Sequence, residues 1–453
     1  MQPEKISSHV LDKLLKAGAD DVVVSVSRQN SSLVKYSNNL INTTKTWENI
    51  DLGIFMALKK KIILTNIKEF SLSAADDVVN KLLKFVKSVS PNNEYAGIAK
   101  GPFSYKEVED GYDKKIASLG DKSIDYVEKA INKALASGAK RTAGVFESSV
   151  TDVSLLSSND VKARDKGTYS YFSIRAFNSK DASGHKVGSS RMLNLLDVEN
   201  LAEQAALISK QCLNPEHGRF GKFDVVFEAL PFANIIDNLG MAMSAFSVEA
   251  GLSCLKNMVG KQVANKKITI IDDGMLRNGF GSSKFDAEGV PTQRNVMVDK
   301  GILKTYLHNT STAKRFNTKT TANAGLLSPE PTNLIVEKGD FSKQELFEQV
   351  KNGLYITNIW YTRFQNYNTG DFSTIPRDGI FVIKNGKINK PIKGIRISEN
   401  MLNLLKNAAA IGNRPERVIG WEIINPIVTP AVLVKNVNIT RPVNNSLGSK
   451  EIN

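Results

Sequence analysis

Histidine and cysteine are the residue types in this chain that could hold a catalytic metal ion. The four histidines are His9, His185, His217 and His308, and the two cysteines are Cys212 and Cys254. No two histidines have the spacing that places two imidazoles on one face of a helix. Cys212 and His217 are five residues apart across a proline-containing break, which is a weak match to any ligand pattern. The sequence therefore predicts no metal site in this chain, while a site built from residues distant in sequence stays open.

Motifs for nucleophilic catalysis and for phosphate binding are not found either. The sequence contains no Gly-x-Ser-x-Gly, no Gly-x-Gly-x-x-Gly and no Gly-x-x-x-x-Gly-Lys-Ser/Thr. Cys254 lies in an apolar segment with a helical pattern, which favours a buried structural thiol over a nucleophile. We therefore expect no catalytic residue in this chain.

The segment 360–371 combines aromatic, amide and charged side chains without helical periodicity. Aromatic side chains supply contact area and amides can hydrogen-bond a peptide backbone, so this mix suits a peptide-binding surface. The candidate contact residues are Tyr361, Arg363, Asn366, Asn368 and Asp371. The alternative is a loop that packs over a sheet. The hypothesis is that these residues contact a peptide substrate or a partner subunit.

The composition is that of a soluble globular protein. Of the 453 residues, 41% are hydrophobic and 23% are charged, and the length suffices for two or three domains. No apolar run approaches the ~20 residues that span a bilayer. The first residues lead into an amphipathic helix pattern and do not resemble a signal peptide. We therefore expect a cytoplasmic protein without membrane contact, with reduced thiols and no disulfide framework.

The net charge of +14 raises nucleic-acid binding as an alternative function. The lysines, however, are scattered through every segment, and no groove-reading motif accompanies them. Nucleic acid is therefore not the partner that we expect.

Residue periodicity predicts an α/β organisation for the first half of the chain. A helix over 3–17 precedes strands at 21–27, 32–36, 50–55 and 62–65, and a second helix follows. After a polar segment, a helix at 121–137 precedes strands between 143 and 176. The stretches 14–19 and 134–139 both join a helix to strands through a glycine cap. The sequence thus predicts duplicated helix–strand–strand units, with domains at 1–105 and 106–215.

The composition changes after residue 215, and the rest, 216–453, is predicted to be one β-rich domain. Apolar residues between Phe232 and Phe246 recur at helical spacing and predict a long apolar helix. From about residue 267 onward strands and turns dominate, and Asn385-Gly386 is typical of a hairpin. The predicted fold class is α+β, with antiparallel strands dominating the C-terminal half.

Several phrases of this half resemble the TldD/PmbA family. The matching stretches, in order, are 285–294 (FDAEGVPTQR), 301–308, 353–357, 369–373 (TGDFS), 379–386 and 411–413. Their order and spacing are similar to those of the family across roughly 222–441, and the N-terminal half fits more loosely. This resemblance implies a peptidase-related function.

The family has two branches, and the resemblance implies which one this chain is closer to. In the TldD branch a helix carries His-Glu-x-x-x-His, and a later cysteine completes a zinc site in which the glutamate is a general base. The corresponding helix here is at 235–243, but no histidine lies between His217 and His308 and no cysteine follows Cys254. Asp237 could imitate the family glutamate, yet a lone carboxylate does not hold catalytic zinc. The chain therefore resembles the PmbA branch, also called TldE.

The resemblance implies a metal-free subunit that pairs with a zinc-bearing TldD-like homologue, or with itself, and helps to process unfolded or small peptides. No cofactor is expected in this chain, and zinc is expected in the partner. Two alternatives stay open. One is a self-sufficient hydrolase with a non-standard site, and the other is a nucleic-acid-associated protein, after the family's description as a gyrase modulator.

Overall fold

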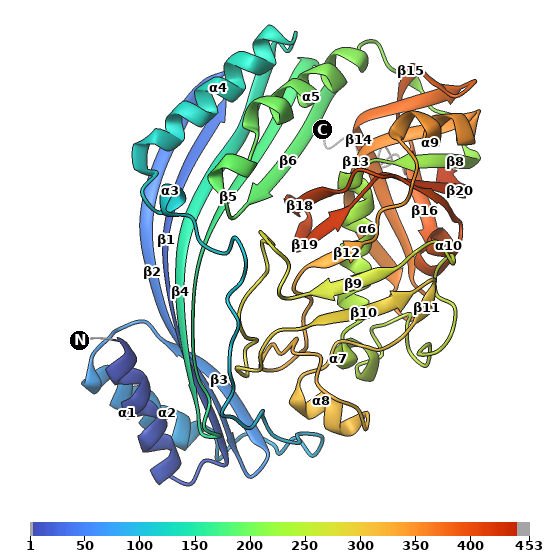
Figure 1. The fold of residues 1–453 in the computed structure, drawn as a ribbon. Coiled ribbons are helices and arrows are strands. Elements are labelled where there is room, and N and C mark those ends of the chain that lie inside the picture. Colours follow the sequence, from blue (N-terminus) through green and yellow to red (C-terminus); the bar gives the residue numbers. More distant parts are fainter. Residues whose placement is uncertain (1–2, 442–453) are drawn as a thin grey trace, which may run out of the picture.

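The computed structural model describes residues 3–441, in which a long curved sheet partly encloses a C-terminal body (Figure 1). The N-terminal part has the elements α1 (Pro3–Lys16), β1 (Asp21–Ser37), β2 (Leu40–Leu58), β3 (Lys61–Ile67), α2 (Leu72–Phe85), α3 (Lys114–Ala117), a 3-10 turn (Gly120–Lys122), α4 (Ser123–Ala136), β4 (Arg141–Ser157), β5 (Lys162–Ser179), β6 (Ala182–Ser190), a second 3-10 turn (Leu193–Leu195) and α5 (Val198–Gln211). Within residues 3–441, no helix combines the length and the apolarity needed to cross a lipid bilayer.

The curved sheet has six antiparallel strands in the order β3-β2-β1-β4-β5-β6. Each half is a helix, three strands and a helix, and the two halves meet where β1 pairs with β4. The predicted duplicated units are therefore present, each with a third strand, and they form one sheet. The segments 21–27 and 32–36, predicted as separate strands, are one strand of 17 residues. Strand β1 stays continuous through its polar middle because it pairs with a strand on each side. There the Ser31 hydroxyl donates to Ser149 (3.0 Å).

All four long helices lie on one face of this sheet. Val22 packs under α1 and α2, whereas Val34 packs under α4 and α5. An even number of positions separates these two valines along β1, so their side chains point to the same face. Val23 points the other way and packs with Phe285 of the C-terminal body. The sheet thus separates α1, α2 and α4 from that body, whereas α5, beside the edge strand β6, also contacts β14 (Asp371–Lys384) of the body.

The C-terminal body contains two further sheets. Its strands are β7 (Glu216–His217), β8 (Gly221–Phe227), β9 (Ile270–Asp273), β10 (Arg294–Asp299), β11 (Ile302–Leu303), β12 (Leu334–Val336), β13 (Gly353–Asn366), β14 (Asp371–Lys384), β15 (Lys387–Lys393), β16 (Arg396–Asn400), β17 (Ala408–Ile411), β18 (Glu416–Gly420), β19 (Ile423–Thr429) and β20 (Val432–Thr440). Its helices are α6 (Ala229–Ala242), α7 (Ala245–Glu249), α8 (Thr310–Arg315), α9 (Lys343–Val350) and α10 (Met401–Lys406). One sheet has the order β11-β10-β9-β12-β19-β18 and the other β13-β8-β20-β16-β14-β15-β7, with β17 beside β20. Most pairs are antiparallel, which confirms the predicted α+β class.

Helix α6 packs against strands of both sheets and is almost entirely buried. It has 14 residues, so the predicted long apolar helix is wrong in its length. The helical segment ends because Ser244 is extended, bridges to the backbone of Leu307 and donates its hydroxyl to the carbonyl of Pro329 (2.8 Å). Phe246 consequently lies on the separate helix α7 and is half-exposed. The helix breaks here because Ser244 contacts residues about sixty or more positions away along the chain. Helical periodicity in the local sequence cannot predict such contacts.

Candidate functional site

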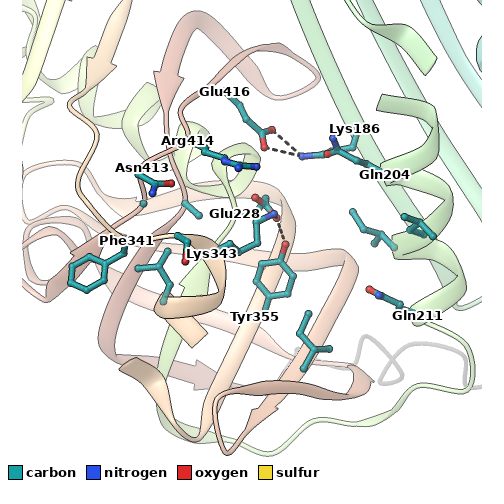
Figure 2. Close-up of a pocket in the computed structure, with 17 residues that line it drawn as sticks. Lys186, Gln204, Gln211, Glu228, Phe341, Lys343, Tyr355, Asn413, Arg414 and Glu416 are labelled. Atoms are coloured by element: carbon teal, nitrogen blue, oxygen red, sulfur yellow. Dashed lines mark hydrogen bonds and ion pairs between the residues drawn. The ribbon is translucent and has the colours of Figure 1, made fainter. Parts of the chain in front are cut away.

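A cavity of ≈ 640 Å³ lies between the N-terminal sheet and the C-terminal body (Figure 2). Strand β6 and helix α5 form one wall, and the end of β8, the start of α9 and the loop before β18 form the other. The polar lining side chains are Lys186, Gln204, Gln211, Glu228, Ser342, Lys343, Tyr355, Asn413, Arg414 and Glu416. The apolar ones are Leu207, Ile208, Phe341, Leu346, Ile388 and Ala431. The site therefore exists only when the two parts of the chain are assembled.

An ion pair between a buried lysine and a partly exposed glutamate crosses the cavity between these two parts. The ammonium of Lys186 on β6 lies 2.9 Å from a carboxylate oxygen of Glu416 on β18. Burial alone would lower the pKa of Lys186, but the carboxylates of Glu416 and Glu228 outweigh it and raise that pKa. Burial would raise the pKa of Glu416, and the Lys186 ammonium outweighs it and lowers that pKa. Both groups are therefore charged at neutral pH.

The second carboxylate of the cavity, which is buried, belongs to Glu228, and this residue directly precedes α6. Its side chain is only 4% exposed, and it accepts hydrogen bonds from the Lys343 ammonium (2.8 Å) and from the Tyr355 hydroxyl. Lys343 is brought there by α9, whose start is fixed by a capping box between Ser342 and Glu345. Both carboxylates of the cavity are thus already engaged by cations of the protein.

Three polar groups of the cavity have no hydrogen bond or ion pair within the part of the chain that the structure describes: Arg414, Gln204 and Gln211. The Arg414 guanidinium extends into the cavity between the two ion pairs (Figure 2). Gln204, Leu207 and Gln211 recur along α5 at the spacing of one helix face, opposite the residues that pack on the sheet. Leu207 is 45% exposed and Ile388 is 36% exposed, so water covers apolar surface here. The arrangement is suited to binding an amphipathic molecule.

The residues predicted from the sequence lie elsewhere, at the end of β13, the following turn and the start of β14. Tyr361 is half-exposed, and the guanidinium of Arg363 lies 5.9 Å from the centre of its ring. The Asn366 side chain accepts from the backbone N–H groups of Asn368 (2.9 Å) and residue 369 (3.3 Å). Asp371 accepts from the side chains of Thr369 and Asn400. Asn366 and Asp371 therefore shape the turn, while the side chains of Tyr361, Arg363 and Asn368 are exposed.

The acid on α6 that could imitate a catalytic glutamate has a structural role. The Asp237 carboxylate accepts the backbone N–H groups of Ile424 (3.1 Å) and Asn425 (3.0 Å) and the side-chain amide of Asn425 (2.8 Å). Burial raises the pKa of Asp237, and these hydrogen bonds act in the opposite direction. The carboxylate fixes the start of β19 to α6 and is fully engaged.

The histidines and thiols are dispersed through the fold. His9 contacts Asp76 (2.6 Å), His185 lies between Ser173 (3.0 Å) and Asn358 (3.1 Å), and His308 lies 3.2 Å from the hydroxyl of Thr312. Burial lowers the pKa of both His185 and His308 to about 4. Burial also raises the pKa of Cys212 to about 12 and that of Cys254 to about 11, so neither thiol is ionised at neutral pH. Among residues 3–441, no three metal-binding side chains lie together.

Two family models match this chain over most of its length. The model for the PmbA/TldA metallopeptidase central domain matches residues 113–213, and the model for the C-terminal domain of the same metallopeptidases matches residues 220–441. The chain belongs to the TldD/PmbA family. The resemblance noted in the sequence is thereby confirmed.

Individual proteins are similar to this chain in sequence or in fold. An uncharacterized protein of Methanocaldococcus jannaschii is 26% identical over 94% of this chain and 98% of its own length. A metalloprotease of Methanothermobacter thermautotrophicus is 31% identical over 52% of this chain and 54% of its own length. The crystal structure of TldE from Thermococcus kodakarensis has a similar fold, with a TM-score of 0.86, 20% identity, and coverage of 96% of this chain and 100% of that chain.

The family motif at 285–294 connects the N-terminal part of the chain to the C-terminal body by hydrogen bonds. The Asp286 carboxylate accepts the backbone N–H groups of residues 288, 290 and 324. The neighbouring carboxyl group of Glu288 accepts those of Ala99 (3.2 Å) and Thr310 (3.4 Å), so it joins the segment after α2 to the start of α8. The phrase that identifies the family therefore builds the fold, and its acids are held away from the cavity.

Sequence reasoning missed the cavity itself. Its lining comes from β6, α5, the end of β8, α9 and the loop before β18, which are spread over more than 200 residues. No short motif joins these segments. The nearest local signal was the apolar and amide stripe on α5, which by sequence alone is equally typical of a surface helix.

Proposed function

We propose that this chain is a metal-free, TldE-like subunit of a TldD/PmbA-type peptidase. The observation that carries the proposal is helix α6, which has no histidine and whose carboxylate, Asp237, is bound by the backbone of residues 424 and 425. The fold similarity to TldE agrees with this assignment. A helix with these side chains supplies packing surface and no zinc ligands.

In this proposal the zinc ion and the general base belong to a TldD-like partner. The complex would be a heterodimer that acts on unfolded or small peptides in the cytoplasm. This chain would hold or enclose the peptide, and Tyr361, Arg363 and Asn368 are proposed contacts with the peptide or the partner. Asn366 and Asp371 would act by shaping the turn that carries those contacts. A homodimer is the alternative assembly.

The test is to purify the chain with and without a TldD-type homologue from the same cell. We expect a complex with the mass of one copy of each by light scattering, zinc only in samples that contain the homologue, and cleavage of an unstructured peptide only by the complex. A homologue with Gln in place of its His-Glu-x-x-x-His glutamate is the control, and its complex should form without cleaving. Stoichiometric zinc and peptide cleavage by the chain alone would overturn the proposal and favour a self-sufficient hydrolase.

A further inference from the structure

The cavity between α5 and the C-terminal body has an imbalance of charge. Three cations line it, Lys186, Lys343 and Arg414, against two carboxylates, Glu228 and Glu416. Lys186 is paired with Glu416 and Lys343 with Glu228, so Arg414 remains without an anionic partner among the described residues. A guanidinium presents parallel N–H donors that match a carboxylate. One anionic group on a ligand would complete the set.

The nearby carboxylates restrict what that anion can be. Glu228 and Glu416 line the same cavity as Arg414, and each is paired with a lysine ammonium. A singly charged group balances the three cations and two carboxylates, whereas a doubly charged group such as a phosphate would leave an uncompensated negative charge beside the carboxylates. The cavity therefore favours a monoanion over a phosphate.

The rest of the lining requires an apolar group and amide partners on the same ligand. Leu207 and Ile388 are half-exposed to the cavity, and Ile208 and Phe341 extend the same apolar surface. Gln204 and Gln211 offer side-chain amides that can donate to and accept from a peptide backbone. A carboxylate, an apolar side chain and backbone amides occur together at the C-terminus of a peptide. The volume of ≈ 640 Å³ lies within the usual range for binding pockets.

We infer that this cavity binds the C-terminal end of a peptide whose last side chain is apolar, with the terminal carboxylate on Arg414 and the side chain against Leu207 and Ile388. The inference rests on the proposed function, since it names the part of a peptide that this subunit holds. It concerns binding by this chain alone and involves neither zinc nor a partner.

The experiment is calorimetric titration of the full chain with N-acetyl-Ala-Leu-Phe, as the free acid and as the C-terminal amide. We expect the acid to bind at least about tenfold more tightly than the amide, because loss of one charge-assisted pair corresponds to roughly that factor. Arg414→Gln should weaken binding of the acid by the same factor and should change the affinity for the amide little. Arg219→Gln is the matched control, since Arg219 is an exposed arginine outside the cavity, and it should bind like the unaltered chain.

Two further arms identify the ligand class. The same peptide ending in Ser should bind at least about tenfold more weakly than the one ending in Phe, and Leu207→Ser should reduce that preference. Octanoate supplies an apolar carboxylate without backbone amides, and equal affinity for octanoate would overturn the assignment to a peptide. Equal binding of acid and amide, no effect of Arg414→Gln, or no binding of either peptide would overturn the site. Complex formation with the homologue, zinc content and peptide cleavage are measured in a separate experiment. A failure of the peptide-binding site can therefore be distinguished from a failure of the proposed function.

Discussion

At Glu288, burial and the neighbouring Asp286 carboxylate raise the pKa to about 8, from an ordinary value of 4.5. An acid whose pKa is higher in the folded protein contributes stability in its protonated form. That contribution is complete below the unfolded pKa and is lost as the pH rises through about 8. Since each pKa unit corresponds to about 1.4 kcal/mol, the component is a few kcal/mol at most.

We therefore predict that the unfolding temperature falls between pH 6 and pH 8.5, and that Glu288→Gln flattens much of this fall. Gln keeps an acceptor for the N–H groups of Ala99 and Thr310 but does not ionise. Glu337→Gln, at an exposed position, is the control and should leave the pH profile unchanged. Calorimetric scans across this pH range check the prediction, and parallel profiles for the Glu288 variant and the unaltered chain would contradict it.

The ion pair in the cavity gives a second prediction for single residues. Lys186→Met removes a buried cation and leaves Glu416 without its partner, which destabilises a protein by about 3–5 kcal/mol when both groups are fully buried. Because Glu416 is 36% exposed, we expect a smaller cost of about 1–3 kcal/mol. The double variant Lys186→Met/Glu416→Met should recover much of that loss in urea unfolding. Additive losses would show that the pair is not coupled.

Among the secondary-structure elements, α6 contains a glycine at which helix propensity and side-chain packing predict opposite effects of substitution. Gly240 lies within the helix, so Gly240→Ala should stabilise by up to about 1 kcal/mol on propensity alone. A Cβ atom there, however, would lie 2.3 Å from a methyl group of Leu334 on β12. We predict a net loss of about 1–3 kcal/mol, since the close packing has no room for the added methyl group. Combined with Leu334→Ala, the substitution should cost less than the sum of the two, and a stabilised Gly240→Ala variant would contradict the prediction.

The same comparison of local and distant forces explains what the sequence could predict. Periodicity located α1, α4 and most strands because their apolar faces repeat within a few residues. The break at Ser244 depends on Leu307 and Pro329, and the continuity of β1 through Ser31 depends on β4. Arg414 and Lys186 meet in one cavity only through the final fold. Contacts between distant segments leave no periodic signal, so these features had to be observed.

For the whole molecule, two ion pairs besides Lys186–Glu416 join the N-terminal sheet to the C-terminal body. Asp378 on β14 accepts hydrogen bonds from Arg175 (2.9 Å) and Ser183 (2.6 Å), and its side chain is 4% exposed. Asp181, in the turn before β6, contacts Lys393 on β15 (2.6 Å), and both of these side chains are well exposed. The two pairs join the same parts of the chain and differ mainly in burial.

Their difference in burial predicts different contributions to the assembly of the molecule. Asp378→Asn should cost about 2–4 kcal/mol and raise hydrogen exchange in β5, β6 and β13, because it leaves the Arg175 cation without its charged partner. Asp181→Asn is the matched control, and solvent screening of its exposed pair should leave stability and exchange unchanged. If the two variants behave alike, the sheet and the body are held together by apolar packing rather than by Asp378. Because the peptide cavity is formed by both parts, Asp378→Asn should also weaken binding of the acid peptide, whereas Asp181→Asn should not.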